Sequence, residues 1–73
     1  MREWLAEARA KAGLTQKEVG KKLDVTESYY SLIEQGLRQK KMDIALVSKL
    51  STIFDIPVTE IIKHETGDAG GEA

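Results

Sequence analysis

The chain has 73 residues, a length that fits one small domain. It contains no cysteine, which excludes a disulfide framework or a thiolate metal site and suits the reducing cytosol, so we expect a cytoplasmic protein. Eleven basic and twelve acidic residues give a formal charge of -1, which by itself does not indicate a polyanionic partner.

The first predicted helix spans residues 2–12, a segment rich in good helix formers. Its apolar stripe consists of Leu5, Ala8 and Ala12. We expect Trp4 to lie half-buried as a lid on the core. Because this segment carries charges throughout and has no apolar run, we do not expect a signal peptide, and no later stretch is long enough to span a membrane.

The second predicted helix begins at Thr15, which has the capping-box spacing to Glu18. Its inward-facing residues are Val19 and Leu23. Gly20 is a poor helix former in the middle of this helix, so we expect that another helix approaches it closely. Asp24 ends the helix, because Asp tolerates a left-handed turn.

The third predicted helix runs from its cap, Thr26, to Gln35 and stops at Gly36. Tyr30 and Ile33 share one face, which we expect to pack in the core, with the Tyr30 hydroxyl at the rim, where it needs a partner or a water molecule. The outer face mixes hydroxyls, a carboxylate and one leucine. No requirement of the core explains that second face.

Asp43 caps a fourth predicted helix over residues 44–54. Its inward stripe consists of Ile44, Val47, Leu50 and Phe54. Leu46 and Ile53 widen the apolar face. We expect these two residues in the core, and a dimer contact near the end of this helix is the alternative.

Pro57 opens a short fifth predicted helix over residues 58–63. Residues 64–73 are small, polar and glycine-rich, which predicts a disordered tail after a domain that spans residues 1–63. This tail holds three acids and no Lys or Arg, so the predicted domain has eleven basic residues against nine acidic ones. On charge alone, that modest excess favours a solvated, lysine-rich surface over a binding site for a polyanion.

About three residues join the second and third predicted helices, which is the spacing of a helix-turn-helix with its second helix free to enter a DNA major groove. Such a pair is common in small helical proteins. The segment LTQKEVGKKLDVTESYYSLIEQG, followed later by LSTIFDIPVTEII, is more specific and closely resembles the Cro/C1-type helix-turn-helix domain of phage repressors and xenobiotic-response-element-like bacterial regulators. The similarity covers roughly residues 5–62. It implies an all-α fold of the lambda-repressor-like DNA-binding type, a compact five-helix bundle in which the third helix reads DNA.

The resemblance also implies roles for single side chains. The base-facing positions are Thr26, Glu27, Ser28 and Leu32. The phosphate-contacting positions are Gln16, Lys17, Tyr29, Arg38, Lys40 and Lys41. Gln16 would also brace the third helix, and an ion pair between Arg9 and Glu34 would tie that helix to the first.

Each of these roles has a plainer alternative. Glu27 can simply complement the helix dipole, or it can accept a hydrogen bond from a cytosine amino group. Ser28 is an ordinary residue for a solvent-facing position. Leu32 is either a single exposed apolar residue, which is normal, or a contact for a thymine methyl. Lys40 and Lys41 are either solubility charges or phosphate contacts that set affinity rather than sequence choice.

Together the motifs predict a sequence-specific DNA-binding transcriptional regulator, a repressor that acts as a homodimer on an inverted-repeat operator in double-stranded DNA. The alternative is a protein-interaction module, antitoxin-like or adaptor, with little or no sequence-specific DNA binding. We do not expect an enzyme, because the single histidine, His64, opens the tail and no nucleophile–base set or phosphate-binding glycine loop is present. Likewise we expect no cofactor, metal ion, membrane partner or small-molecule ligand.

Overall fold

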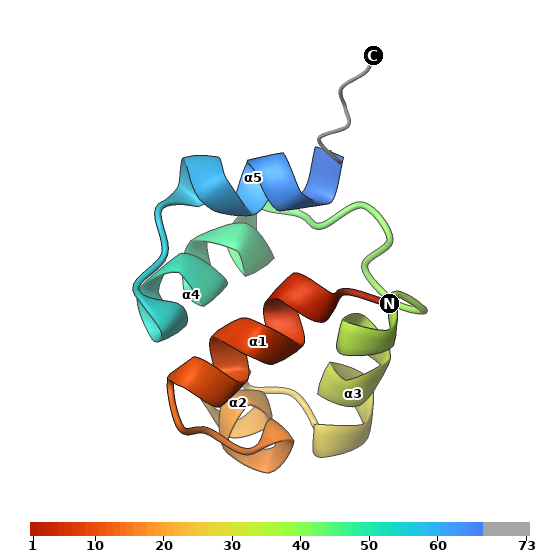
Figure 1. Cartoon of the computed structure of the whole chain (residues 1–73). Helices are drawn as coiled ribbons and strands as arrows, with labels where there is room; N and C mark the ends of the chain where they lie inside the picture. The colour runs from red at the N-terminus through yellow and green to blue at the C-terminus, as the bar shows by residue number, and fades with distance from the viewer. Residues whose placement is uncertain (67–73) are drawn as a thin grey trace. The chain divides into compact units, whose positions relative to one another are not determined.

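The computed structural model describes residues 1–66, which form five α-helices and no strand (Figure 1). The helices are α1 (Glu3–Lys11), α2 (Gln16–Leu23), α3 (Glu27–Gln35), α4 (Ile44–Phe54) and α5 (Val58–Thr66). The bounds of α1 to α4 agree with the predicted ones to within a residue. The all-α, five-helix prediction is therefore confirmed. By its internal contacts the chain divides into a first unit, residues 1–40, and a second unit that begins at Lys41.

In the first unit, α2 packs against α3, and α1 also contacts α3 (Figure 1). Local sequence explains where α2 and α3 begin. The Thr15 hydroxyl accepts the Glu18 N–H, and the Glu18 carboxylate accepts the Thr15 N–H, which completes the predicted capping box. Thr26 caps α3 by accepting the Tyr29 N–H at 3.0 Å.

The buried apolar side chains of the first unit come from all three helices. They are Leu5, Val19, Leu23, Tyr30 and Ile33. Trp4 is half-buried, as predicted for a lid. Ala12 is exposed, contrary to its predicted place in the apolar stripe, because α1 ends at Lys11 and Ala12 is its C-cap.

Three residues, 24–26, connect α2 to α3, as the helix-turn-helix spacing predicted. Asp24 takes the left-handed conformation with φ 63° and ends α2. The Val25 N–H donates to the Gly20 carbonyl at 2.8 Å, which folds the turn back onto α2. A Cβ at Gly20 would lie 3.0 Å from the Val25 carbonyl oxygen and 3.2 Å from that of Thr26. Gly20 is therefore required by the close approach of the turn that leads into α3, which refines the prediction of a close helix.

The second unit contains α4 and α5, which pack against each other. Asp43 caps α4 by accepting the Leu46 N–H at 2.7 Å, and Asp55 ends it with φ 55°. The Ser51 hydroxyl donates to the Ile56 carbonyl across the turn that follows. The buried apolar side chains are Leu46, Leu50 and Ile61. Leu46 is thus part of the core, as expected.

Two predictions about the second unit were wrong. Ile44 is 87% exposed, not inward-facing, because Leu46 and Leu50 set the buried stripe and a residue two positions before Leu46 lies about 200° around the helix. The structure also continues α5 through Thr66, three residues into the segment predicted as a tail from His64. Residues 58–66 include no glycine or proline to end the helix, and the Thr66 hydroxyl donates to the Ile62 carbonyl at 2.9 Å. The rest of the predicted tail, residues 67–73, lies outside the described residues.

Candidate nucleic-acid interface

Helix α3 has one locked face and one open face. Tyr30, Ile33 and Glu34 are buried on the first face. Thr26, Glu27 and Ser28 are exposed around the first turn of α3. The buried residues fix the rotation of the helix about its own axis, so the exposed ones point away from the core.

The exposed first turn offers hydrogen-bonding groups of both kinds. The Thr26 hydroxyl oxygen is occupied by its capping bond, but the same group still has a proton to donate. Ser28 adds a second hydroxyl, and Glu27 adds a carboxylate at the positive end of the helix dipole. Hydroxyls and carboxylates of this kind can bond base edges in a major groove.

Tyr29 and Leu32 contribute less surface than the first turn. Both side chains are half-buried. Only part of Leu32 is therefore available for contact with a thymine methyl, and the rest packs inward. Its carbonyl oxygen accepts the Leu37 and Arg38 N–H groups, which begins the loop after α3.

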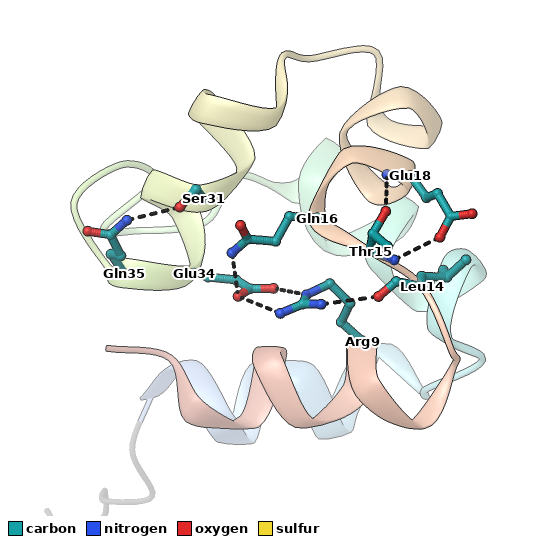
Figure 2. Close-up of polar contacts among 8 residues, drawn as sticks. All are labelled: Arg9, Leu14, Thr15, Gln16, Glu18, Ser31, Glu34 and Gln35. Atoms are coloured by element: carbon teal, nitrogen blue, oxygen red, sulfur yellow. Dashed lines mark hydrogen bonds and ion pairs between the residues drawn. The ribbon is translucent and has the colours of Figure 1, made fainter.

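Glu34 joins the three helices of the first unit through its carboxylate (Figure 2). Arg9 of α1 donates from Nε to Glu34 Oε2 at 2.6 Å, and Gln16 of α2 donates from Nε2 to Glu34 Oε1 at 3.1 Å. Arg9 also donates to the Leu14 carbonyl at 3.1 Å, which fixes the loop between α1 and α2. Glu34 is 2% exposed and Arg9 is 23% exposed. The arrangement places the first residue of α2 beside the last turn of α3.

The electrostatics of this cluster favour the ionised pair. Burial alone would raise the pKa of Glu34, but the Arg9 guanidinium and the Gln16 amide, which both donate hydrogen bonds to its carboxylate, hold that pKa below its ordinary value. The hydrogen bond to Glu34 raises the pKa of Arg9, against the opposing effect of burial. The pair is therefore charged throughout the neutral range.

Tyr30 fills the core beside this cluster. Its side chain is fully buried, and its hydroxyl has no hydrogen-bond partner of good geometry among the described residues, although Glu34 is close enough to influence it. Burial, followed by the Glu34 charge, raises the pKa of the Tyr30 hydroxyl far above its ordinary value. The prediction that this hydroxyl would reach the rim was wrong, because the whole ring lies inside the core.

Arg2 holds the loop that follows α3, a role that the sequence analysis did not find. Its guanidinium donates to the carbonyls of Ile33 at 2.6 Å, Arg38 at 3.1 Å and Gln39. Its own N–H donates to the Glu34 carbonyl at 2.8 Å. These partners are 31 to 37 residues away along the chain. No local pattern links them, so only the folded chain reveals the contact.

The predicted phosphate-contacting cations of the first unit are all open to solvent. Lys17 is exposed in the first turn of α2, and Arg38 and Lys40 are exposed in the loop after α3. Gln16 is half-buried, with one amide hydrogen bonded to Glu34. Lys41 is exposed too, but it begins the second unit. Cationic side chains in a loop and N–H groups at a helix N-terminus can both bind phosphate oxygens.

Residues 1–66 offer neither a metal site nor a membrane span. That range holds no group of three or more His, Cys, Asp or Glu side chains arranged to bind a metal ion. None of its helices combines the length and apolar character of a membrane span.

Known proteins provide an independent comparison. The family model described as "Helix-turn-helix" matches residues 5–61. A Bacillus subtilis (strain 168) protein named "Uncharacterized HTH-type transcriptional regulator YqaF" is 35% identical over an alignment 74 residues long, and the match covers 94% of this chain and 97% of that protein. No solved structure matches the chain significantly. The family match over most of the chain agrees with the observed helix pair, so this protein belongs to the Cro/C1-type helix-turn-helix family.

Proposed function

We propose that the protein is a cytoplasmic, sequence-specific DNA-binding transcriptional regulator that acts as a repressor. The observation that carries this proposal is the two-faced α3: its buried face is locked, while Thr26, Glu27 and Ser28 are exposed around its first turn. Membership of the helix-turn-helix family and the printed name of the B. subtilis relative support it. In this proposal α3 enters the major groove.

The contacts divide into two kinds. Thr26, Glu27, Ser28 and the exposed part of Leu32 read base edges. The remaining candidates contact phosphates and set affinity. These are Gln16, Lys17, Tyr29, Arg38, Lys40 and Lys41.

The proposed partner is an inverted-repeat operator bound by a homodimer. One small domain makes few base contacts, and a two-fold dimer on two half-sites doubles them. Exposed apolar side chains in the second unit support self-association. They are Ile44, Val58 and Ile62.

Alanine variants on a duplex selected from random DNA test the base-reading assignment. A variant with Ser28→Ala and Leu32→Ala should change which bases are preferred at one or two positions of each half-site, with a loss of about 1 to 2 kcal/mol on the original duplex. Ser48→Ala is the matched control, because Ser48 is exposed on α4, outside the proposed interface. If the double variant folds and selects the same sequence as the wild type, α3 does not read bases through these side chains.

The second candidate function is a protein-interaction module. Its support is the same exposed apolar surface of the second unit, above all Ile44 at 87% exposure. Absence of binding to any duplex at low salt, together with retained binding to a protein partner, would favour this function over DNA binding.

A further inference from the structure

Arg2 is an unusual residue for its position near the start of α1. Among residues 1–66, only Arg2 and Glu34 are charged and buried, and Arg2 is 8% exposed. Burying a guanidinium is costly unless its N–H groups are bonded. Arg2 meets this condition with backbone carbonyls from two places: Ile33 in the last turn of α3, and Arg38 and Gln39 in the loop beyond Gly36.

The end of α3 explains why a cation belongs there. The last turn of α3 contains no basic residue of its own, and its terminal carbonyls carry the negative end of the helix dipole. Arg2, the N-cap of α1, supplies the missing positive charge. A guanidinium also has five donors in a planar array, so it can bond several carbonyls at once, which a lysine ammonium does less well.

The loop held by Arg2 contains a residue in an unfavourable backbone conformation. Gln39 has φ 54°, a left-handed conformation that is unfavourable for a residue with a side chain. The loop turns at Gly36 with φ 80° and contains no proline to restrict it. Arg38 and Lys40 flank Gln39, so the bond to the Gln39 carbonyl fixes the backbone between the two exposed cations.

We propose that Arg2 is a positioning residue of the DNA interface: it holds the loop after α3 so that Arg38 and Lys40 meet DNA phosphates. This inference rests on the proposed function. Arg2 itself is buried and does not touch DNA. Its loss leaves the base-reading first turn of α3 intact and removes the fixed placement of the loop.

The test compares Arg2→Met, which keeps the length of the stem, and Arg2→Lys, which keeps the charge, with the wild type. Lys11→Gln is the matched control, because Lys11 is exposed at the other end of α1, about 13 Å along the helix axis. Binding to the selected duplex is followed against salt, and amide hydrogen exchange of Leu37 and Arg38 reports on the loop. Circular dichroism checks that each variant is folded.

The expected result has three parts. Arg2→Met weakens binding about fivefold to tenfold and lowers the slope of log affinity against log salt by about 1 to 2, the values for loss of one or both of the Arg38 and Lys40 phosphate contacts. Its preferred sequence is unchanged, and the loop amides exchange faster while those of α2 do not. Arg2→Lys shows the same change to a smaller degree, and Lys11→Gln stays close to the wild type.

Other results would overturn the inference in distinguishable ways. Wild-type affinity and salt slope in a folded Arg2→Met variant would overturn it and leave the proposed function standing. If Arg2→Met does not fold, Arg2→Lys carries the same comparison. If the wild-type protein binds no duplex even at low salt, the proposed function fails, and the role of Arg2 in DNA binding fails with it.

Discussion

At the scale of single residues, Glu34 is the structural centre of the first unit. One buried carboxylate receives hydrogen bonds from α1 and α2 and fixes how both helices meet α3. A buried ion pair contributes little net stability compared with a well-packed apolar pair, but removal of one partner leaves an uncompensated charge. The main effect of the Arg9–Glu34 pair is therefore to orient α3, and loss of one partner should strongly destabilise the fold.

Substitution of Arg9 tests this role. Arg9→Met should lower the free energy of unfolding by about 3 kcal/mol. In this variant Glu34 keeps its charge in a buried site, and of its two side-chain donors among residues 1–66, Arg9 and Gln16, only the Gln16 amide remains. Urea denaturation measures the change. Lys11→Met is the matched control on the exposed surface of α1 and should stay within about 0.5 kcal/mol. Equal effects of the two variants would contradict the central role of the ion pair.

The same carboxylate predicts a pH dependence. The pKa of Glu34 is lowered from 4.5 in the folded protein, so on acidification the unfolded chain takes up this proton before the folded chain does. The contribution is fully present above pH 4.5 and is lost as pH falls through the lower folded pKa. Urea denaturation between pH 3 and 6 should therefore show a steeper acid loss for the wild type than for Glu34→Gln. Parallel curves would show that Glu34 titrates alike in both states.

Removal of the Tyr30 hydroxyl should stabilise the protein. Its buried hydroxyl has no well-placed hydrogen-bond partner among the described residues, and such a group costs free energy in the folded state. Tyr30→Phe keeps the ring and should raise the free energy of unfolding by up to about 1 kcal/mol. Thermal unfolding would report this as a higher melting temperature. A loss of more than about 1 kcal/mol would mean that the hydroxyl bonds Glu34 or a buried water molecule in solution.

At the scale of elements, the turn between α2 and α3 depends on the absence of a side chain at Gly20. Helix propensity alone favours Ala there by about 1 kcal/mol. The close carbonyls of Val25 and Thr26 are backbone atoms, so they cannot move away without disturbing the turn. Packing therefore overrides propensity at this position.

Gly20→Ala should destabilise the protein by about 2 kcal/mol and weaken DNA binding further by shifting the start of α3. Gly13→Ala is the comparison, because a Cβ at Gly13 meets nothing within 4 Å and only its φ of +70° is unfavourable. That variant should lose about 1 kcal/mol and bind DNA normally once folded. Urea denaturation and a binding assay on the same samples separate the two effects. Neutral behaviour of Gly20→Ala would show that the turn is adaptable.

The elements also show what could be predicted from sequence. The caps Thr15, Thr26 and Asp43 and the left-handed residue Asp24 act within a few positions along the chain, so local chemistry was enough to identify them. The family motifs supplied the fold type.

The misses have a different physical origin. The contacts of Arg2 join residues more than thirty positions apart and leave no periodic trace in the sequence. The left-handed conformation of Gln39 was missed because glycine and asparagine, and not glutamine, usually indicate such a position. Ile44 was wrongly predicted to face inward. An apolar residue at the start of a helix is compatible with more than one apolar face, and the burial of its neighbours decides between them. The burial of the Tyr30 hydroxyl depended on the depth of the core, which sequence alone does not give.

At the scale of the whole molecule, the proposal assigns recognition of DNA bases and affinity for DNA phosphates to different parts of the chain. In the proposed function, the exposed first turn of α3 contacts the bases, while the exposed cations at the N-terminus of α2 and in the loop after α3 contact phosphates. With a net charge of -1, the protein has no strong overall attraction for DNA, so local placement of these cations has to provide it.

Selection of bound duplexes from a random pool, with the affinity of the winning sequence followed against salt, tests the central claim most directly. We predict enrichment of an inverted repeat with half-sites about one helical turn apart, and binding that weakens steeply as salt rises. Failure to enrich any sequence, even at low salt, would contradict the claim that α3 reads DNA.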